Sequence, residues 1–327
     1  MNGRGIADAL IEAPIFTSFT KIGYAARKRL EGWSSLDDYD LTGKVIVVTG
    51  ATSGLGYAAA QQFAKCAATL VLVGRGADRN ERVVSELIAA TGNKSITQVP
   101  ADMGDLHQVR DLAARLLGDH DRLDVLVHNA GALSPECQLA AEGTEATVAS
   151  QVVGPFLLTA LLLDRLTASA PARVITMSSG GMYAAGLTVS QLQMTPEKYN
   201  GTKQYALAKR AQVTLNEMWA ERFGESGIRF HSMHPGWADT SGVDASLPTF
   251  SKLMGPLLRT PDQGADTLVW LAAADVALAS NGKFWLDRRQ RAIHKLPSTK
   301  KTDTAERRAE LWDWVVRTAG IEPSLSS

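Results

Sequence analysis

A tyrosine and a lysine four residues apart are the side chains in this sequence best suited to proton transfer. Tyr205 and Lys209 lie in a segment with the composition of a helix, and residues four apart share one helical face. The phenol and the ammonium would therefore point into the same pocket. A tyrosine ordinarily titrates at about 10, and a nearby cation favours the phenolate. The pair predicts a proton donor and acceptor usable near neutral pH, although the same spacing arises by chance on many helices.

A cluster of glycines provides the second chemical signal. Residues 45–48 form a short β-branched apolar run, and Gly50, Gly54 and Gly56 follow it immediately before a helix-like segment. Glycines permit a tight turn and a close approach of the backbone, while the free N–H groups of the new helix face an anion. The turn therefore predicts a cradle for a dinucleotide pyrophosphate, and an ordinary strand-to-helix turn is the alternative. The remaining residues expected in this cradle are Thr52, Ser53 and Leu55.

Strand-like and helix-like segments alternate along the chain, and these elements must position the site. Strands are predicted at 45–48, 69–73, 96–100, 124–128, 173–177, 228–233 and 283–286, and the main helices at 57–64, 78–90, 105–117, 143–166, 202–223 and 261–274. This order predicts an α/β fold with a Rossmann-type, doubly wound parallel sheet in a single domain. The expected divisions are an N-terminal amphipathic extension (1–43), the dinucleotide-binding catalytic part (44–286) and a charged C-terminal tail with a final helix (287–327).

Ligands of such sheets bind beyond the carboxyl ends of the strands, so residues that follow strands are informative. Arg75 follows the second strand, where an enzyme using NAD commonly has an acid for the ribose 2′-hydroxyl. An arginine can instead pair with a 2′-phosphate, so we expect NADP rather than NAD. Asp102 and Met103 follow the third strand and are placed to meet the adenine. The alternative for Asp102 is a cap on the helix that begins near Asp105.

Small and polar residues follow the fourth strand. Asn129 can tie strand ends together through its amide, while Ala130 and Gly131 leave room for a cofactor. Two serines, Ser178 and Ser179, place hydroxyls at the end of the fifth strand. The next strand end carries a cofactor-binding turn, whose backbone amides we expect to be exposed toward a carboxamide or a phosphate. The residues of this turn are Pro235, Gly236 and Thr240.

Composition narrows the function further. The chain has 327 residues, 45% of them apolar, and 34 positive charges balance 34 negative ones. A balanced charge gives no reason to expect a nucleic-acid partner, so a small-molecule substrate is predicted. The two cysteines do not suggest a disulfide framework, which favours a cytoplasmic location, and no export signal or apolar run of spanning length is evident. No metal site is expected.

The segments at the two ends and one loop have weaker signals. Ile11, Ile15, Phe19 and Ile22 are spaced as on one amphipathic helix, which would cover a groove of its own domain or, less readily, contact a membrane surface. The basic residues after 287 are interpreted as a solvated surface, and a helix at about 304–318 is expected to pack on the body or on a second subunit. Residues 241–261 have the composition of a lid over an apolar substrate.

Several of these signals occur together in the order typical of the short-chain dehydrogenase/reductase superfamily, which the chain resembles from about 41 to 286. The family pattern Thr-Gly-x-x-x-Gly-x-Gly corresponds to residues 49–56, Asn-Ala-Gly to 129–131, Tyr-x-x-x-Lys to 205–209 and Pro-Gly to 235–236. The resemblance implies NAD(P)-dependent interconversion of an alcohol and a carbonyl. Met182, Tyr183, Trp237 and the lid suggest that the substrate is small and apolar. The resemblance also implies that Tyr205 protonates the carbonyl oxygen, that Lys209 holds the nicotinamide ribose and lowers the tyrosine pKa, and that Ser179 binds the carbonyl, with Ser178 as the rival.

Two departures from the family pattern qualify this interpretation. Many relatives have an asparagine that supports a water in the proton relay, and Gln151 occupies that position here. A binding protein that senses NADP(H) or serves as a scaffold with little turnover is therefore the alternative. The second departure is a long insertion before Tyr205, which resembles the retinol-dehydrogenase-like branch and would form a wall of the substrate pocket. It contains Leu187, Leu192, Met194 and Pro196. Relatives commonly form homo-oligomers, but the extra terminal segments would hinder this.

Overall fold

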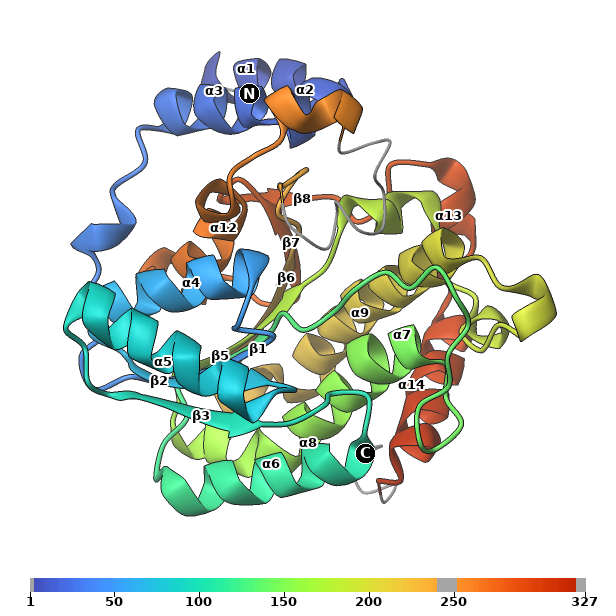
Figure 1. Cartoon of the computed structure of the whole chain (residues 1–327). Coiled ribbons are helices and arrows are strands. Elements are labelled where there is room, and N and C mark those ends of the chain that lie inside the picture. Colours follow the sequence, from blue (N-terminus) through green and yellow to red (C-terminus); the bar gives the residue numbers. More distant parts are fainter. Residues whose placement is uncertain (1–2, 240–251, 322–327) are drawn as a thin grey trace.

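The central element is one twisted sheet that carries its helices on both faces (Figure 1). The computed structural model describes residues 3–239 and 252–321. Within them, eight strands lie in the order β3-β2-β1-β4-β5-β6-β7-β8, all parallel except β8, which pairs antiparallel with β7. The predicted doubly wound α/β fold in a single domain is therefore confirmed. The strands are β1 (Val45–Thr49), β2 (Thr69–Gly74), β3 (Ile96–Pro100), β4 (Val125–His128), β5 (Ala172–Met177), β6 (Ile228–Met233), β7 (Lys283–Leu286) and β8 (Arg289–Arg291).

Helices cover the sheet in two layers because successive strand residues point to opposite faces. Along β1, Val45 and Val47 belong to one hydrophobic core, while Ile46 and Val48 belong to the other. The helices around the Ile46 core are α4 (Gly54–Lys65), α5 (Ala77–Thr91) and α12 (Pro261–Ala273). Those around the Val45 core are α6 (Leu106–Asp119), α8 (Gly154–Ala168), α9 (Gly201–Phe223) and α14 (Ala305–Ala319).

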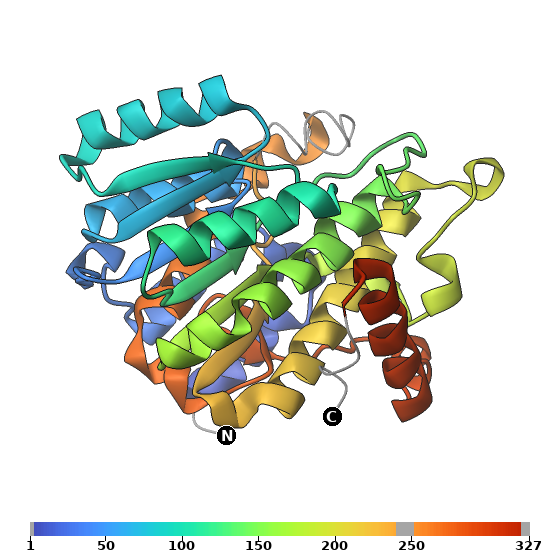
Figure 2. The same ribbon diagram turned by 90° about the horizontal axis from the view of Figure 1, so that it is seen from below.

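The final helix, α14, packs on the body of the protein beside α8 and α9 (Figure 2). Leu311, Trp312 and Val315 are fully buried, and the Trp312 ring lies edge-on to Phe156 of α8 at 5.0 Å between centroids. The expectation that this helix packs on the body is confirmed. It is preceded by the short helix α13 (Pro297–Lys301).

The helix predicted at 143–166 is interrupted. A short helix α7 (Ala146–Val148) leads into a π-helical turn, Ala149–Val153, before α8 begins. Such turns change the direction of the side chains they carry and occur often at functional sites; this one carries Gln151. The stretch Ala146–Ala168 is long and apolar enough to cross a membrane by length and composition, contrary to the expectation from sequence, and 72% of its most apolar window is buried inside the protein.

The N-terminal extension consists of three helices and not of the single amphipathic helix expected. These are α1 (Gly3–Glu12), α2 (Ile15–Phe19) and α3 (Lys21–Glu31), which lie together beside the β7–β8 edge of the sheet (Figure 1). Phe19 is buried, whereas Ile22 is 53% exposed, so the two do not share one apolar face. The chain turns sharply between α2 and α3, where a Cβ on Gly23 would collide with the carbonyl of Thr17.

Candidate active site

Tyr205, Lys209 and Ser179 lie together at the carboxyl end of β5. Ser179 follows β5, while the other two residues lie on α9. The side chain of Ser179 interacts with the Tyr205 hydroxyl and lowers the pKa of the phenol. The Lys209 ammonium lies 5.2 Å from the centroid of the Tyr205 ring and donates to the carbonyl of Met177, 3.0 Å away. The structure thus brings together a phenol, a hydroxyl and an amine that the sequence pattern singled out.

The two serines after β5 point in different directions. Ser178 is buried, and its hydroxyl donates to the main-chain carbonyl of Lys209 at 3.1 Å. Ser179 is half-buried, and its Oγ accepts from the N–H of Gly181 while also meeting Tyr205. Ser178 therefore links α9 to the end of β5 by a hydrogen bond. Ser179 provides the hydroxyl that lies beside the phenol of Tyr205.

Burial controls the protonation of this site. It raises the pKa of Tyr205 above its ordinary value, and the hydrogen bond with Ser179 offsets this increase only in part. Burial also lowers the pKa of Lys209 to about 7. Burial therefore outweighs the effect of Ser179 on the pKa of Tyr205. The lowering of this pKa by Lys209, which the resemblance implies, stays a prediction. Lys209 is the group of this pair that titrates near neutral pH.

The glycine turn between β1 and α4 has the shape of a dinucleotide cradle. Gly50 and Gly54 both have positive φ, +66° and +52°. A Cβ on Gly50 would lie 2.8 Å from the Cα of Ala130, and one on Gly56 would collide with the carbonyl of Gly50. The helix begins after Ser53, whose side chain makes no capping hydrogen bond, so the first N–H groups of α4 remain available to an anion. These residues fit the pyrophosphate of a dinucleotide, and Thr52 and Leu55 line the same turn half-buried.

Asn129 connects the ends of β4 and β1. Its Nδ2 donates to the carbonyls of Thr49 at 3.0 Å and Gly50 at 3.1 Å. The hydroxyl of Thr49 in turn accepts from the N–H groups of Asn129 and Ala130. The predicted tying role of Asn129 is thus visible, and Thr49 completes it. Gly131 is exposed next to this junction, and a Cβ there would lie 2.8 Å from the amide of Gln151.

Residues expected at the adenosine end lie at two strand ends. Arg75 is exposed after β2, and α5 begins just beyond it at Gly76 without a side-chain cap. Asp102 is half-buried and accepts from the N–H of Gly104 at 2.8 Å. The alternative of Asp102 as the helix cap is wrong, because Asp105 caps α6 by accepting from two backbone N–H groups. Met103 is buried in the core and presents no side chain at the surface.

The turn after β6 differs from expectation. The N–H of Gly236 donates to Nδ1 of His234, and the N–H of Trp237 donates to the carbonyl of Phe19 at 2.8 Å. These two amides are therefore engaged within the protein, and the expectation that they are exposed is wrong. Pro235 also accepts from Arg259 through its carbonyl. Thr240 lies outside the described residues.

Gln151 is fully buried, and both its side chain and its main-chain carbonyl are hydrogen-bonded. Its side-chain Nε2 donates to the carbonyl of Ala132 at 2.7 Å, and its main-chain carbonyl accepts from Nε2 of Gln212 at 2.6 Å. No hydrogen-bond partner is present for its Oε1 among the described residues. The extra methylene of glutamine and the π-helical turn thus direct this amide toward Ala132.

A cavity of about 30 Å³ lies behind Gln151, between β4, β5, α8 and α9. His128, Gln151, Gln212 and Asn216 line it, and we call these four residues the interior polar cluster. Each has one buried polar atom without a partner in the described part of the chain: Nδ1 of His128, Oε1 of Gln151, Oε1 of Gln212 and Nδ2 of Asn216. Burial lowers the pKa of His128 to about 3, so this imidazole is neutral. Apart from Gln151, no member of this cluster was indicated by the sequence pattern.

Residues proposed from sequence as walls of an apolar pocket are instead part of the packed core. In the insertion before Tyr205, Leu187, Leu192 and Met194 are buried in the main hydrophobic core. Met182 and Tyr183 belong to a smaller buried cluster with Phe19. Most of the predicted lid lies outside the described residues. Across the described ranges, no group of three or more histidine, cysteine or acidic side chains is arranged to hold a metal ion.

Comparison with known proteins agrees with this geometry. Residues 44–249 match the family model for the short chain dehydrogenases. The chain is 38% identical over 270 residues to human dehydrogenase/reductase SDR family member 12, covering 82% of this chain and 84% of that protein. It is 30% identical to human retinol dehydrogenase 13, covering 86% of each chain. The NADP complex of RhlG from Pseudomonas aeruginosa superposes with a TM-score of 0.62 at 25% identity, covering 75% of this chain and 96% of that one. The chain therefore belongs to the short-chain dehydrogenase/reductase family of oxidoreductases.

Proposed function

We propose that this protein is an NADP-preferring oxidoreductase that interconverts an alcohol and a carbonyl on a small apolar substrate. The observation that carries the proposal is that three groups converge at the end of β5. The Lys209 ammonium lies 5.2 Å from the centroid of the Tyr205 ring, and the side chain of Ser179 lowers the pKa of the same phenol. Proton transfer by a positioned group requires such proximity before any tuning of its pKa. The relative named retinol dehydrogenase 13 supports an apolar alcohol as substrate.

In this mechanism the chain supplies the proton and the electrostatic support. Nicotinamide, when bound, provides or accepts the hydride. During reduction Tyr205 donates its phenolic proton to the carbonyl oxygen of the substrate, and in oxidation it takes the proton from the alcohol. Ser179 hydrogen-bonds the same oxygen, which stabilises the charge that develops there. Protonated Lys209, 5.2 Å from the ring centroid, favours the phenolate that remains.

The preference for NADP rests on the exposed Arg75 and the uncapped start of α5. A guanidinium and free backbone N–H groups are the donors that a 2′-phosphate requires. No acid stands at the end of β2 to bind a ribose 2′-hydroxyl instead. The NADP complex of the related RhlG protein is consistent with this choice.

The catalytic assignment is tested with the variant Tyr205→Phe, which keeps the ring and removes the proton. Turnover of NADPH with a carbonyl found by screening should fall about 100- to 10,000-fold. Binding of NADPH should be nearly unchanged, because the substitution leaves the cradle at Gly50–Gly56 unaltered. Tyr199→Phe removes a hydroxyl from a tyrosine outside the proposed machinery and is the matched control. Full turnover in Tyr205→Phe would contradict the mechanism.

The cofactor assignment is tested with Arg75→Ala. Its affinity for NADPH should fall about tenfold or more, since a charge-assisted contact contributes roughly 1.5–3 kcal/mol. The affinity for NADH should change little. Titration of both cofactors against the wild-type protein and against the variant Arg79→Ala separates a specific contact from a general loss of positive charge. Arg79 is an exposed arginine on α5, close to Arg75 in the sequence. Equal losses for NADPH and NADH in Arg75→Ala would remove the argument for NADP.

A second candidate is a protein that senses NADP(H) and has little turnover. The position of Gln151 favours it, since its amide is committed to Ala132 and its carbonyl to Gln212. Stoichiometric binding of NADPH without oxidation across a broad panel of carbonyls would favour this candidate over the enzyme.

A further inference from the structure

Phe19, in the N-terminal extension, contacts both loops that flank the candidate active site. A Cβ on Gly180, the residue after Ser179, would lie 2.6 Å from the Phe19 ring. The Phe19 carbonyl accepts from the N–H of Trp237, and a Cβ on Gly236 would lie 2.7 Å from the same oxygen. Phe19 is 3% exposed. This residue is therefore packed between the loop that carries Ser179 and the turn proposed to contact the cofactor.

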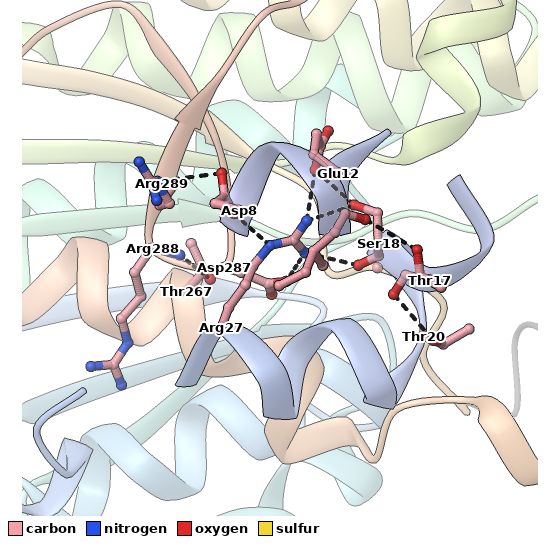
Figure 3. Close-up of polar contacts among 12 residues, drawn as sticks. Asp8, Glu12, Thr17, Ser18, Thr20, Arg27, Thr267, Asp287, Arg288 and Arg289 are labelled. Atoms are coloured by element: carbon pink, nitrogen blue, oxygen red, sulfur yellow. Dashed lines mark hydrogen bonds and ion pairs between the residues drawn. The ribbon is translucent and has the colours of Figure 1, made fainter. Parts of the chain in front are cut away.

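Buried charged groups hold the segment that carries Phe19 in place. Arg27 makes five hydrogen bonds, to Asp8, Glu12, Asp287 and both the carbonyl and hydroxyl of Ser18, so that all the N–H groups of its guanidinium are used. Figure 3 shows Arg27 pointing into this group of acids. Its side chain is fully buried, as is that of Asp287 on the other side of the pair.

A second arginine joins this segment to the turn after β6. Arg259 forms a two-pronged ion pair with Asp287, at 2.6 and 2.9 Å. It also donates to the carbonyls of Ser18 and Thr20, on either side of Phe19, and to the carbonyl of Pro235. We call Asp8, Glu12, Arg27, Arg259 and Asp287 the N-terminal ion network. It fixes residues 18–20 and the Pro235–Gly236 turn to the same buried carboxylate.

From these contacts we infer that the N-terminal extension is part of the catalytic architecture, and that Phe19 is a positioning residue for Ser179 and for the Pro235–Gly236 turn. The inference rests on the proposed function for the role of Ser179. The aromatic ring fills the space left by Gly180 and prevents the Ser179 loop from moving toward the extension. The Phe19 carbonyl accepts a hydrogen bond from the N–H of Trp237 and so restricts the conformations that the turn can adopt.

The contacts of residue 19 require a particular kind of side chain at this position. Its backbone contacts are available to any residue, whereas the contact with Gly180 requires a ring that reaches the loop. A smaller side chain would leave the ion network intact but release the Ser179 loop. It would also remove the ring contacts with His234 and Trp237, at 4.5 and 5.8 Å between centroids, that hold the turn after β6. Because small displacements of catalytic groups are costly, we expect kcat to fall about 10- to 100-fold in Phe19→Leu. KM should change less than kcat, since Phe19 is buried and does not line an open surface.

The experiment compares Phe19→Leu with Phe16→Leu in the full chain. Phe16 is 53% exposed on the same helix, α2, and meets only the edge of Trp237 among the aromatic rings described. Each variant is measured for kcat, KM, NADPH affinity by fluorescence titration, and thermal unfolding. The Phe19 variant should lose kcat and bind NADPH more weakly, while Phe16→Leu should retain wild-type values. Phe19→Trp, which restores an aromatic ring, should recover more kcat than Phe19→Leu.

The outcomes separate this inference from the proposed function. If folded Phe19→Leu has the kcat and NADPH affinity of the wild type, the positioning role is wrong. A lower melting temperature with unchanged kcat per folded molecule would also overturn it, because that is the result of packing alone. If the wild type itself binds NADPH but reduces no carbonyl, the proposed function fails, and an unchanged NADPH affinity in Phe19→Leu would then count against the inference.

Discussion

The N-terminal ion network and the interior polar cluster are both buried and polar, but they differ in how completely their groups are paired. In the network, every N–H of Arg27 has a partner, and Asp287 is shared between two arginines. In the cluster, His128, Gln151, Gln212 and Asn216 each retain a polar atom without a protein partner in the described ranges. A buried ionic group must be paired to be tolerated, whereas a neutral amide beside a cavity can rely on water. The contrast distinguishes a rigid joint from a site built for hydration.

Their positions in the fold suit these roles. The network joins α1 and α3 to the turn between β7 and β8, which carries Asp287, and to the turn after β6. It therefore connects segments that are far apart in sequence. The cluster lies under the π-helical turn that carries Gln151, between two helices and two strands. Its cavity of about 30 Å³ has room for roughly two water molecules. The Thr159 hydroxyl donates to the Pro155 carbonyl and so accepts from Nε2 of neutral His128, which leaves Nδ1 as an acceptor for such a water.

The largest expected effect comes from breaking the network with Arg27→Met. Removal of one partner from a buried ion pair typically costs about 3–5 kcal/mol. We expect the lower end, since Asp8 keeps Arg291, Glu12 keeps Lys295 and Asp287 keeps Arg259. The measurement is the free energy of unfolding by urea. Arg115→Met is the control: this arginine pairs with Asp119 on an exposed helical face, and such pairs contribute about 0–1 kcal/mol. Equal effects in the two variants would show that the network is not a rigid joint.

The pattern of strands was predictable from the sequence because the buried parallel strands are nearly continuous apolar runs. The bounds of β3, β6 and β7 agree with the predicted ones, and those of the other predicted strands differ by one residue at an end. The glycine turn and the pairing of Tyr205 with Lys209 depend on local spacing, which sequence reveals directly. Strand β8, Arg289–Arg291, escaped detection because its charged residues have no apolar alternation.

The features that the sequence did not predict depend on contacts between segments that are distant in the chain. The arginines after Leu286 were expected in solvent, yet the side chains of Arg288 and Arg291 are 5% and 8% exposed because Asp266 and Asp8 face them from other elements. Nothing near Phe19 in sequence indicates Gly180 as its neighbour. The same holds for Gln151. The sequence singles this residue out, but its side chain is held by Ala132 and its main-chain carbonyl by Gln212, sixty-one positions away.

The smallest expected change in the free energy of unfolding comes from the interior polar cluster. Two buried asparagines, one in the cluster and one outside it, provide the test. Asn216→Leu removes a buried Nδ2 that has no protein partner in the described structure, and the neighbouring cavity can take the larger side chain. Because no protein hydrogen bond is lost and apolar surface is gained, the free energy of unfolding should change by less than about 1 kcal/mol. Asn80→Leu is the matched control, since its Nδ2 donates to the carbonyl of Gly74 at 3.0 Å and to Gln98 at 3.2 Å. Its loss should cost about 1–3 kcal/mol, because Gly74 and Gln98 would retain acceptors without donors. If Asn216→Leu lowers the free energy of unfolding as much as Asn80→Leu does, bound water must stabilise the Asn216 amide as strongly as protein groups stabilise that of Asn80. The interior polar cluster would then contribute to stability as the N-terminal ion network does, with water in place of protein partners.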